Sequence, residues 1–576
     1  MERRMRVFVT LIETDGNQRY IFATNRLRQN VGASELIFRV CTQVVLEAAV
    51  RAGAGDCWRS STTERARRLV DPACNRRIED GADCEVVVAT SGRAILLTRS
   101  LDRARAVVRD VTAWGAKQAP GLSVAGATAE CDLGAGPVHE VIRRLARTLP
   151  RVRGTLPAPE SRFLRWPVVA DCATSGLPAS VWARPTGGED AEPQSNVAQA
   201  KYRQAQQALE RLQSQVARDQ RLPASIEEIE RQLGEVSWLG VVHADGNGLG
   251  KVFIDLDRHL QASQGSGNRA YLDGLRRFSL GLELCTESAF RRALVVAASH
   301  VRDDVAPVVP LVLGGDDFTA LCDGRSALPL ARTFLEAFEQ EAASDTIEPV
   351  GDIVAQVTRA AFGVPRLSAC AGVALVKPHS PFYAAYDLAE ALLAAAKTVK
   401  WTARDSQGGE LPCSALDFHL LAAGSAGDLG LVRGERTSQD GRARLWGGPY
   451  VVTPASALAQ VADQGWLTSH ELKRLEERVR AIVDRDEEGR RRLPGTVVQD
   501  LRAAVFEGKD IADRSLQLVL PRYQTRGLAA LIEAEAPGSS ASGQAPSLFR
   551  RESESADATV FVTSYLDVLD AAELRA

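Results

Sequence analysis

Short apolar runs and longer amphipathic stretches occur in the same order twice along the chain. In each copy a strand-like run and a helical stretch precede two short strands joined by a tight turn, and a second helical stretch and a strand of small residues follow. The copies span residues 7–127 and 239–374, and their helices are expected at 33–50, 101–114, 269–298 and 326–343. This order is typical of a ferredoxin-like sheet with helices on one face. We therefore predict an α+β fold with two such units related by duplication.

The composition changes between and after the two units. Residues 184–196 form a polar linker and 201–218 a Gln-rich helix, while 537–556 are typical of a disordered tether before a docking helix over 560–574. The predicted boundaries are 1–180 for the first unit and the segment after it, 181–235 for the linker and helix, 236–430 for the second unit, 431–535 for a helical C-terminal domain, and 536–576 for a flexible tail with a short terminal helix.

One helix start in the C-terminal part carries a specific signal. Residues 468–471 fit a capping box that begins at Thr468. The apolar stripe behind it consists of Leu472, Leu475, Val479 and Ile482. The three arginines at 490–492 are expected in a solvated loop rather than at an RNA contact.

Composition and charge narrow the class of protein. The chain has 576 residues, a formal net charge of −3 and 45% hydrophobic residues, so it is expected to be globular and to lack the basic excess that would hold a long RNA unaided. No apolar run reaches the ~18 residues of a membrane helix, and the start does not resemble a signal peptide. We expect a cytoplasmic protein. No CxxC pair and no HExxH motif is present, so zinc is not expected.

Candidate chemistry begins at Gly314-Gly315-Asp316-Asp317, which lies between two apolar strands. The two glycines allow a tight hairpin turn and let a triphosphate approach the backbone without a Cβ in the way. Two adjacent carboxylates repel each other, and a divalent metal such as Mg²⁺ supplies the counter-charge economically. Taken alone, the motif is equally typical of an ordinary Gly-Asp turn.

A second acidic strand end favours the metal interpretation. Asp245 closes a buried strand and precedes the glycine-rich loop Gly246-Asn247-Gly248. In a ferredoxin-like sheet the first strand lies beside the hairpin, so Asp245 is predicted to lie next to Asp316 and Asp317. Three carboxylates at one sheet edge are what two-metal phosphoryl transfer requires. The spacing of the loop excludes a P-loop, a dinucleotide fingerprint and an EF-hand.

Together these residues resemble the palm domain of the large polymerase-like subunit of type III CRISPR effector complexes and, more distantly, GGDEF diguanylate cyclases and polymerase palms. The cyclases would carry Glu at position 317. Further residues that agree are the segment 20–34 at the start of the first palm, Lys397 as a phosphate-facing lysine, and 413–419 as a closing strand. Good matches cover about 236–450 and weaker ones about 5–180.

The resemblance implies a degenerate first palm and a nucleotidyltransferase in the second. Asp245, Asp316 and Asp317 would be catalytic and would hold Mg²⁺ or Mn²⁺. ATP would be the substrate. The product would be cyclic oligoadenylate, an antiviral second messenger. Other effector subunits with guide and target RNA would be the partners. The residues implied in nucleotide binding are Gly246, Asn247, Gly248, Gly314, Gly315, Ser368, Lys397 and Ser34.

Two strand residues near these motifs have simpler interpretations. A serine in a strand, such as Ser368, is more often packed than ligand-facing. His243 is more typical of a core residue with a satisfied hydrogen bond than of a metal ligand.

The sequence departs from the family in three places. It starts directly at the first palm, without the family's His-Asp nuclease domain, so cleavage of single-stranded DNA is not expected. Only an echo of the family's four-cysteine zinc site remains around Cys172. Arg93-Ala94 stands where the second unit has Asp316-Asp317, so the first unit is expected to hold no metal and to shape the second nucleotide pocket across a pseudo-twofold interface.

Two further hypotheses fit the residues. One is a stand-alone nucleotidyl cyclase that makes another cyclic (di)nucleotide. The other is a non-catalytic scaffold of the effector complex or a nucleotide sensor. Retention of all three aspartates favours an enzyme, because a palm without catalysis would need none of them.

Overall fold

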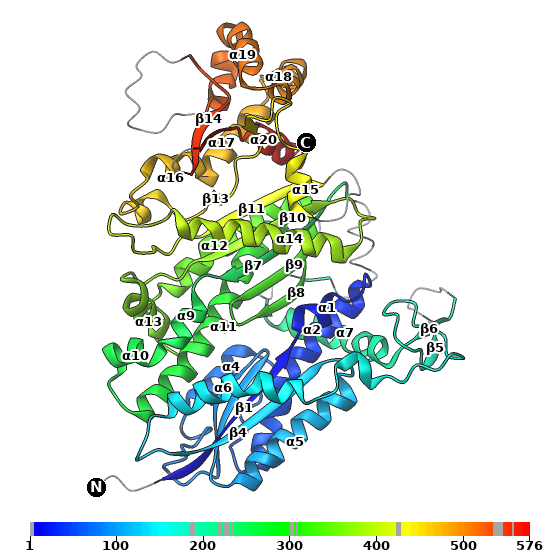
Figure 1. Cartoon of the computed structure of the whole chain (residues 1–576), viewed down its shortest axis with the longest axis vertical. Coiled ribbons are helices and arrows are strands. Elements are labelled where there is room, and N and C mark those ends of the chain that lie inside the picture. The colour runs from blue at the N-terminus through cyan, green and yellow to red at the C-terminus, as the bar shows by residue number, and fades with distance from the viewer. Residues whose placement is uncertain are drawn as a thin grey trace.

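The computed structural model describes residues 5–184, 190–216, 221–223, 228, 231, 236–299, 305–306, 308–421, 428–533, 545–555 and 558–575. A four-stranded and a six-stranded sheet carry most of the helices, and a mainly helical C-terminal part follows (Figure 1). This mixed architecture confirms the predicted combination of helices and sheets. In the part of the chain just defined, no helix has both the length and the apolar character needed to cross a membrane.

The first sheet has the strand order β2-β3-β1-β4, with every neighbouring pair antiparallel. Its strands are β1 (Arg6–Asp15), β2 (Cys84–Thr90), β3 (Arg93–Thr98) and β4 (Ser123–Asp132). Its main helices are α2 (Leu27–Arg39), α3 (Val45–Arg51), α5 (Leu101–Gln118) and α6 (Val138–Gly154). The helix predicted over 33–50 therefore starts earlier, and a π-helical turn at Val40–Val44 divides it.

The second sheet repeats this order and extends it. Its strands are β7 (Leu239–Gly246), β8 (Val308–Gly314), β9 (Asp317–Asp323), β10 (Ala369–Val376), β11 (Ala415–Leu421) and β13 (Tyr450–Val451). The order β10-β7-β9-β8 matches β4-β1-β3-β2, and β11 and β13 are added beside β10. The two sheets thus share a ferredoxin-like strand order; their interpretation as two palms stays a prediction.

Aromatic packing fixes the hairpin of the second sheet. The principal helices here are α11 (Asn268–Ala298), α12 (Gly324–Ala342) and α14 (Phe382–Ala396). Phe318 on β9 lies 5.5 Å from Phe290 on α11 and 4.5 Å from Phe334 on α12, between ring centroids, and all three are buried. Since Phe318 directly follows Asp317, the core holds the start of β9 in place.

A buried polar cluster joins α11 to the N-terminal part. Arg65 on α4 (Thr62–Val70) pairs with Glu283 at 2.8 Å, and both are fully buried. Glu287, one turn further on, accepts hydrogen bonds from Thr62 and, at 2.6 Å, from Gln215 just after α7 (Asn196–Ser214). Burial, reinforced by the charge of Glu283, raises the pKa of Glu287 to about 7.

Replacing Glu287 with glutamine is therefore expected to stabilise the protein at pH 8. Because the folded-state pKa lies above that of the unfolded chain, the folded state binds more protons between pH ~4.5 and 7, and stability falls as pH rises through that window. Glu287→Gln should raise the free energy of unfolding at pH 8 by about 1–2 kcal/mol and change little at pH 5. Urea titrations at both pH values measure this. Glu64→Gln, at an exposed ion pair on α4, should have little effect; destabilisation by Glu287→Gln at pH 8 would contradict the expectation.

The C-terminal part corrects two predictions. It contains α16 (Gln464–His470), α17 (Leu472–Val483), α18 (Gly495–Glu507) and α19 (Lys509–Tyr523). The capping-box prediction is wrong, because Thr468 lies in the last turn of α16 and Glu471 is the N-cap of α17 without a side-chain cap bond. The apolar stripe of α17 is buried as predicted. Residues 490–492 are exposed, as expected of a solvated loop.

The tether predicted over 537–556 is wrong for its described residues, because the chain there forms β14 (Arg550–Ser555), which pairs antiparallel with β15 (Ala558–Val562). The terminal helix predicted over 560–574 is confirmed as α20 (Tyr565–Glu573). Leu548, Phe549 and Arg550 are buried. Residues 537–544 and 556 of the predicted tether lie outside the described residues, as do 185–189 of the linker. Parts of that linker pair as β5 (Val181–Ala183) and β6 (Glu192–Gln194).

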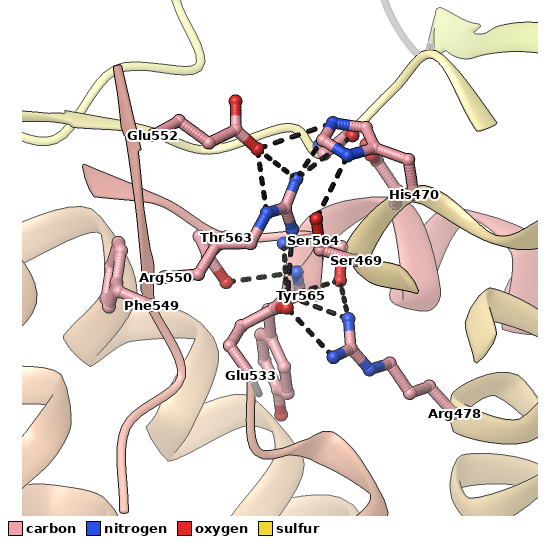
Figure 2. A network of polar contacts seen from close by, with 12 residues as sticks. Ser469, His470, Arg478, Glu533, Phe549, Arg550, Glu552, Thr563, Ser564 and Tyr565 are labelled. Carbon is pink, nitrogen blue, oxygen red and sulfur yellow. Dashed lines mark hydrogen bonds and ion pairs between the residues drawn. The ribbon is translucent and has the colours of Figure 1, made fainter. Parts of the chain in front are cut away.

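Polar contacts hold this last segment (Figure 2). Glu533 accepts hydrogen bonds from Arg478 at 2.8 and 2.9 Å, from Arg550 at 3.3 Å and from the Ser564 hydroxyl at 2.7 Å. Glu533 and both arginines are at least 94% buried. The segment is therefore part of the C-terminal core rather than a tether.

Candidate functional site

The three predicted carboxylates meet at one edge of the second sheet. Asp245 is the penultimate residue of β7, and the pairing of Ala244 with Phe318 places it beside Asp317 at the start of β9. Asp316 lies in the turn that joins β8 to β9. The carboxyl of Asp245 is within hydrogen-bonding reach of those of Asp316 and Asp317. The strand order thus brings together residues that lie some 70 positions apart in the chain.

The carboxylates carry more negative charge than their surroundings compensate. Burial, together with the charge of Asp245, raises the pKa of Asp316 to about 7. Burial and the charges of the other two aspartates raise the pKa of Asp317 well above its usual range. Burial acts in the same direction on Asp245, but the ammonium of Lys397 outweighs it and lowers the pKa of that carboxyl. The edge therefore favours additional positive charge.

Lys397 is the cation that reaches this edge. It follows α14 directly and its Nζ forms an ion pair with Oδ2 of Asp245. The sequence predicted a phosphate-facing lysine, and in the ligand-free protein the ammonium lies on a carboxylate instead. A phosphate or a second cation at the edge would change this pairing.

Glycines leave room beside the carboxylates. A Cβ on Gly246 would lie 2.7 Å from Cδ1 of Leu249 and 3.0 Å from the Cβ of Asp316, so a larger residue would require these side chains to shift. Gly315 has φ +64° with open space around it, and its carbonyl accepts a 2.6 Å hydrogen bond from Thr286 on α11. A Cβ on Gly314 would lie 3.0 Å from that of Ser91, so the hairpin turns of the two sheets lie against each other.

Asn247 and Ser368 bind each other. The Asn247 amide donates to the Ser368 hydroxyl at 3.0 Å and to the Cys413 carbonyl at 3.1 Å, and the backbone N–H of Asn247 donates to the Ser368 carbonyl at 2.8 Å. Ser368 is 2% exposed, which favours the packing interpretation. Asn247 thus locks the loop after β7 to the strands beside it, a role that the sequence reasoning missed.

Gly248, Ser34 and His243 make no direct contact with the three carboxylates in the hydrogen bonds of the described residues. Gly248 is the N-cap of the short helix α9 (Leu249–Ile254) beside the loop. Ser34 lies half-buried on α2, and no hydrogen bond joins it to the described residues of the carboxylate edge. His243 is 3% exposed and lies 2.8 Å from the Thr319 hydroxyl through Nδ1, which confirms its interpretation as a satisfied core residue.

Tyr386 on α14 was not found from the sequence. Its ring stacks on Phe22 of α1 (Asn17–Phe22) with 3.7 Å between centroids, and its buried hydroxyl has no hydrogen-bond partner among the described residues. Burial raises its pKa, and the charges of Glu390, Asp317, Asp387 and Asp245 add to this effect. It lines a cavity of about 640 Å³ between α1 and α14. The sequence signal that could have pointed to Tyr386 is its position as an aromatic residue within an Ala-rich helix.

The first sheet carries an ion pair where the second carries carboxylates. Thr90 pairs with Arg93 and Gly314 with Asp317, so Arg93 corresponds to Asp317. The predicted alignment of Arg93-Ala94 with Asp316-Asp317 is therefore one residue off, because both turns contain two residues. Glu13, which corresponds to Asp245, pairs with Arg93 at 2.5 Å and with Arg153 at 2.8 Å. The first sheet thus supplies its own counter-charges.

A hard divalent cation fits the donor chemistry of the carboxylate edge. Carboxylate oxygens are the ligands that Mg²⁺ prefers, and burial together with the charges of the neighbouring aspartates raises the pKa values of Asp316 and Asp317. Over the described ranges, no three His, Cys, Asp or Glu side chains converge closely enough to ligate one metal ion. At the edge itself the Lys397 ammonium occupies Asp245, so metal binding would require this lysine to move.

Comparisons with known proteins give structural similarity alone. No family model and no curated protein matches the chain. Csm1 from T. onnurineus matches with a TM-score of 0.45 and 16% identity, over 92% of this chain and 65% of the other. A Csm1–Csm4 cassette with cA3 matches with a TM-score of 0.41 and 14% identity, over 92% of this chain and 65% of the other. A Csm1–Csm4 cassette with AMPPNP matches with a TM-score of 0.39 and 13% identity, again over 92% of this chain and 65% of the other.

The chain thus spans 65% of the length of these Csm1 chains. At these identities the similarity concerns the fold. The solved structures that this chain resembles are of Csm1, a protein of type III CRISPR complexes, which is the family that the sequence motifs resemble.

Proposed function

We propose that the chain is a nucleotidyltransferase that makes cyclic oligoadenylate from ATP within a type III CRISPR effector complex. The observation that carries the proposal is the meeting of Asp245, Asp316 and Asp317 beside Lys397 at one sheet edge. The similar Csm1–Csm4 cassettes include complexes with cA3, cA4 and ATP. In this proposal the two sheets are two palms, the first without catalytic carboxylates.

The residues have distinct proposed roles. Asp245, Asp316 and Asp317 would hold Mg²⁺ or Mn²⁺, which would lower the pKa of an attacking 3′-hydroxyl and stabilise the pyrophosphate leaving group. Lys397 would exchange Asp245 for the triphosphate. Gly315 leaves space for phosphate oxygens at the backbone, and Gly246 lets Asp316 approach the end of β7. Asn247 would keep the loop after β7 rigid, and Tyr386 would line the wall of the substrate cavity.

Incubation with each nucleoside triphosphate and Mg²⁺, alone and with candidate protein and RNA partners, tests the proposal. Mass spectrometry of the products separates cyclic oligoadenylate from another cyclic dinucleotide, which would indicate a stand-alone cyclase. Nucleotide binding without turnover under every condition would indicate a scaffold or sensor.

Lys397→Met is expected to separate metal binding from turnover. Without the ammonium on Asp245, nucleotide-free protein should bind Mn²⁺ a few-fold more tightly, because the lysine competes for the same oxygen. Turnover of ATP should nevertheless fall about 100-fold, since one cation for the transferred phosphates is lost. Electron paramagnetic resonance titration with Mn²⁺ and a turnover assay measure the two effects. Lys400→Met, at an exposed position three residues later, is the matched control; weaker Mn²⁺ binding by Lys397→Met would contradict this role.

A further inference from the structure

A second cavity lies entirely within the N-terminal part. It measures about 650 Å³, and all of its lining residues fall between positions 15 and 201. Its walls come from α1, the start of β4, the end of α6, the segment 156–163 and α7, and Lys201 of α7 contacts Tyr20 of α1. The size is within the range of about 300–1,000 Å³ typical of small-molecule sites.

The lining is cationic. Its charged side chains are Arg19, Arg153, Arg162, Lys201 and Asp15. Asp15, the one carboxylate, already pairs with Arg153 at 3.3 Å. The cavity therefore favours an anion.

Lys201 is buried in this wall without an acidic partner. It is 3% exposed, its Nζ donates to the Tyr20 carbonyl and lies 4.2 Å from the centroid of the Tyr20 ring, and no carboxylate in the described part of the chain pairs with it. Burial lowers the pKa of Lys201 to about 7. A buried charge is costly unless a counter-charge accompanies it. A carbonyl and a ring face compensate it partly, and an anion in the cavity would complete the compensation.

An adjoining cavity extends the cationic surface. It measures about 600 Å³, shares Gly121, Arg162 and Phe163 with the first, and adds Lys117 and Arg203 without any acidic residue in its lining. The segment that carries Arg162 and Phe163 thus lies between two cationic hollows. An extended anion could occupy both.

Aromatic rings accompany these cations. Tyr20 and Phe163 both line the first cavity. Aromatic side chains stack on nucleobases, while arginine and lysine bind phosphate oxygens. A ligand with an aromatic base and at least one phosphate matches both features.

We propose that these two cavities form a binding site for a nucleoside phosphate, with Lys201 and Arg162 at the phosphates and Tyr20 and Phe163 at the base. The lining of the two cavities contains none of the three aspartates, and the first cavity adjoins the cavity that Tyr386 lines, with which it shares Arg19, Ala23 and Thr24. Its cations are side chains, so it binds without a divalent metal. The proposal does not depend on catalysis at the carboxylate edge.

Equilibrium dialysis of the full chain with AMP and ATP in EDTA tests this site, with inorganic phosphate and adenosine as competitors. Lys201→Met should weaken nucleotide binding at least tenfold, and Arg162→Gln at least threefold. Arg147→Gln, at an exposed position on α6 outside both cavities, and Asp316→Asn/Asp317→Asn should bind like wild type. Lys201→Met should unfold at or above the wild-type temperature, because an uncompensated buried charge is removed. If Lys201→Met fails to fold, nucleotide binding by Arg162→Gln, a change at an exposed position, still tests the proposal.

Several outcomes would overturn the proposal. They are no binding of either nucleotide in EDTA, wild-type affinity in both cavity variants, and loss of binding in the double aspartate variant, which would place the ligand at the carboxylate edge. Competition by phosphate as effective as that by AMP would overturn the role assigned to the base.

Discussion

Asp316→Asn/Asp317→Asn is expected to abolish nucleotide turnover, by at least about 1,000-fold, while leaving the protein folded. The substitution keeps the shape of both side chains and removes two of the three carboxylates that would hold the cations. Turnover of each nucleoside triphosphate with Mg²⁺ and with Mn²⁺ measures the loss. If the variant and wild type act alike under every condition in which wild type is active, these aspartates are not catalytic.

The same variant is expected to be more stable than wild type above neutral pH. The pKa of Asp316 is raised to about 7, so the folded state binds more protons than the unfolded chain between pH ~4 and 7. Wild-type stability therefore falls as pH rises through that window. The asparagines carry no charge, and the variant should gain about 1–3 kcal/mol in free energy of unfolding at pH 8 in EDTA.

Glu13→Gln is the matched control in the first sheet. Glu13 corresponds to Asp245 but pairs with Arg93 and Arg153, so removal of its charge should destabilise the protein. Opposite signs at the two sheet edges would show that the second edge, unlike the first, carries more negative charge than its own cation, Lys397, compensates. Destabilisation by the double asparagine variant at pH 8 would contradict this account.

The sequence predicted the elements that local patterns determine. Apolar alternation and the Gly-Gly turn located both hairpins, and the strand order then placed Asp245 beside Asp317. The partners of Asn247 could not be predicted, because its amide binds Ser368 and Cys413, which lie more than 120 positions away. Tyr386 was missed for the same reason: its role depends on Phe22, from the other end of the chain.

The prediction of a disordered tether over 537–556 failed for a different physical reason. Residues 550–555 are rich in Arg, Glu and Ser, a composition that favours disorder when those charges face water. Here Arg550 lies against Glu533, and Glu552 lies against Arg550 and His470. Charges that pair inside the core give the same composition as charges that repel in solvent, so composition alone could not separate the two states.

Glu533→Gln is expected to destabilise the C-terminal part by about 3–5 kcal/mol, because it leaves the buried guanidinium groups of Arg478 and Arg550 without their shared counter-charge. Pairing with the two arginines outweighs burial and lowers the pKa of Glu533 to about 2. Its contribution is therefore present above pH ~4.5 and is lost as pH falls towards 2. Urea unfolding at pH 7 and pH 3 should show a smaller difference between wild type and variant at the lower pH.

Two comparisons make this prediction specific to the buried network. Glu488→Gln breaks an exposed pair with Arg490, whose side chains are 64% and 73% exposed, and should cost less than about 1 kcal/mol. Arg478→Met combined with Glu533→Gln should cost less than the sum of the single changes, because removing one arginine lowers the charge left unpaired. Limited proteolysis should cleave between β14 and α20 in Glu533→Gln before it cleaves the sheets, since β14 and α20 depend on this carboxylate through Arg550 and Ser564. A cost below about 1 kcal/mol for Glu533→Gln at pH 7 would show that the arginines find other partners and that apolar packing alone holds the segment.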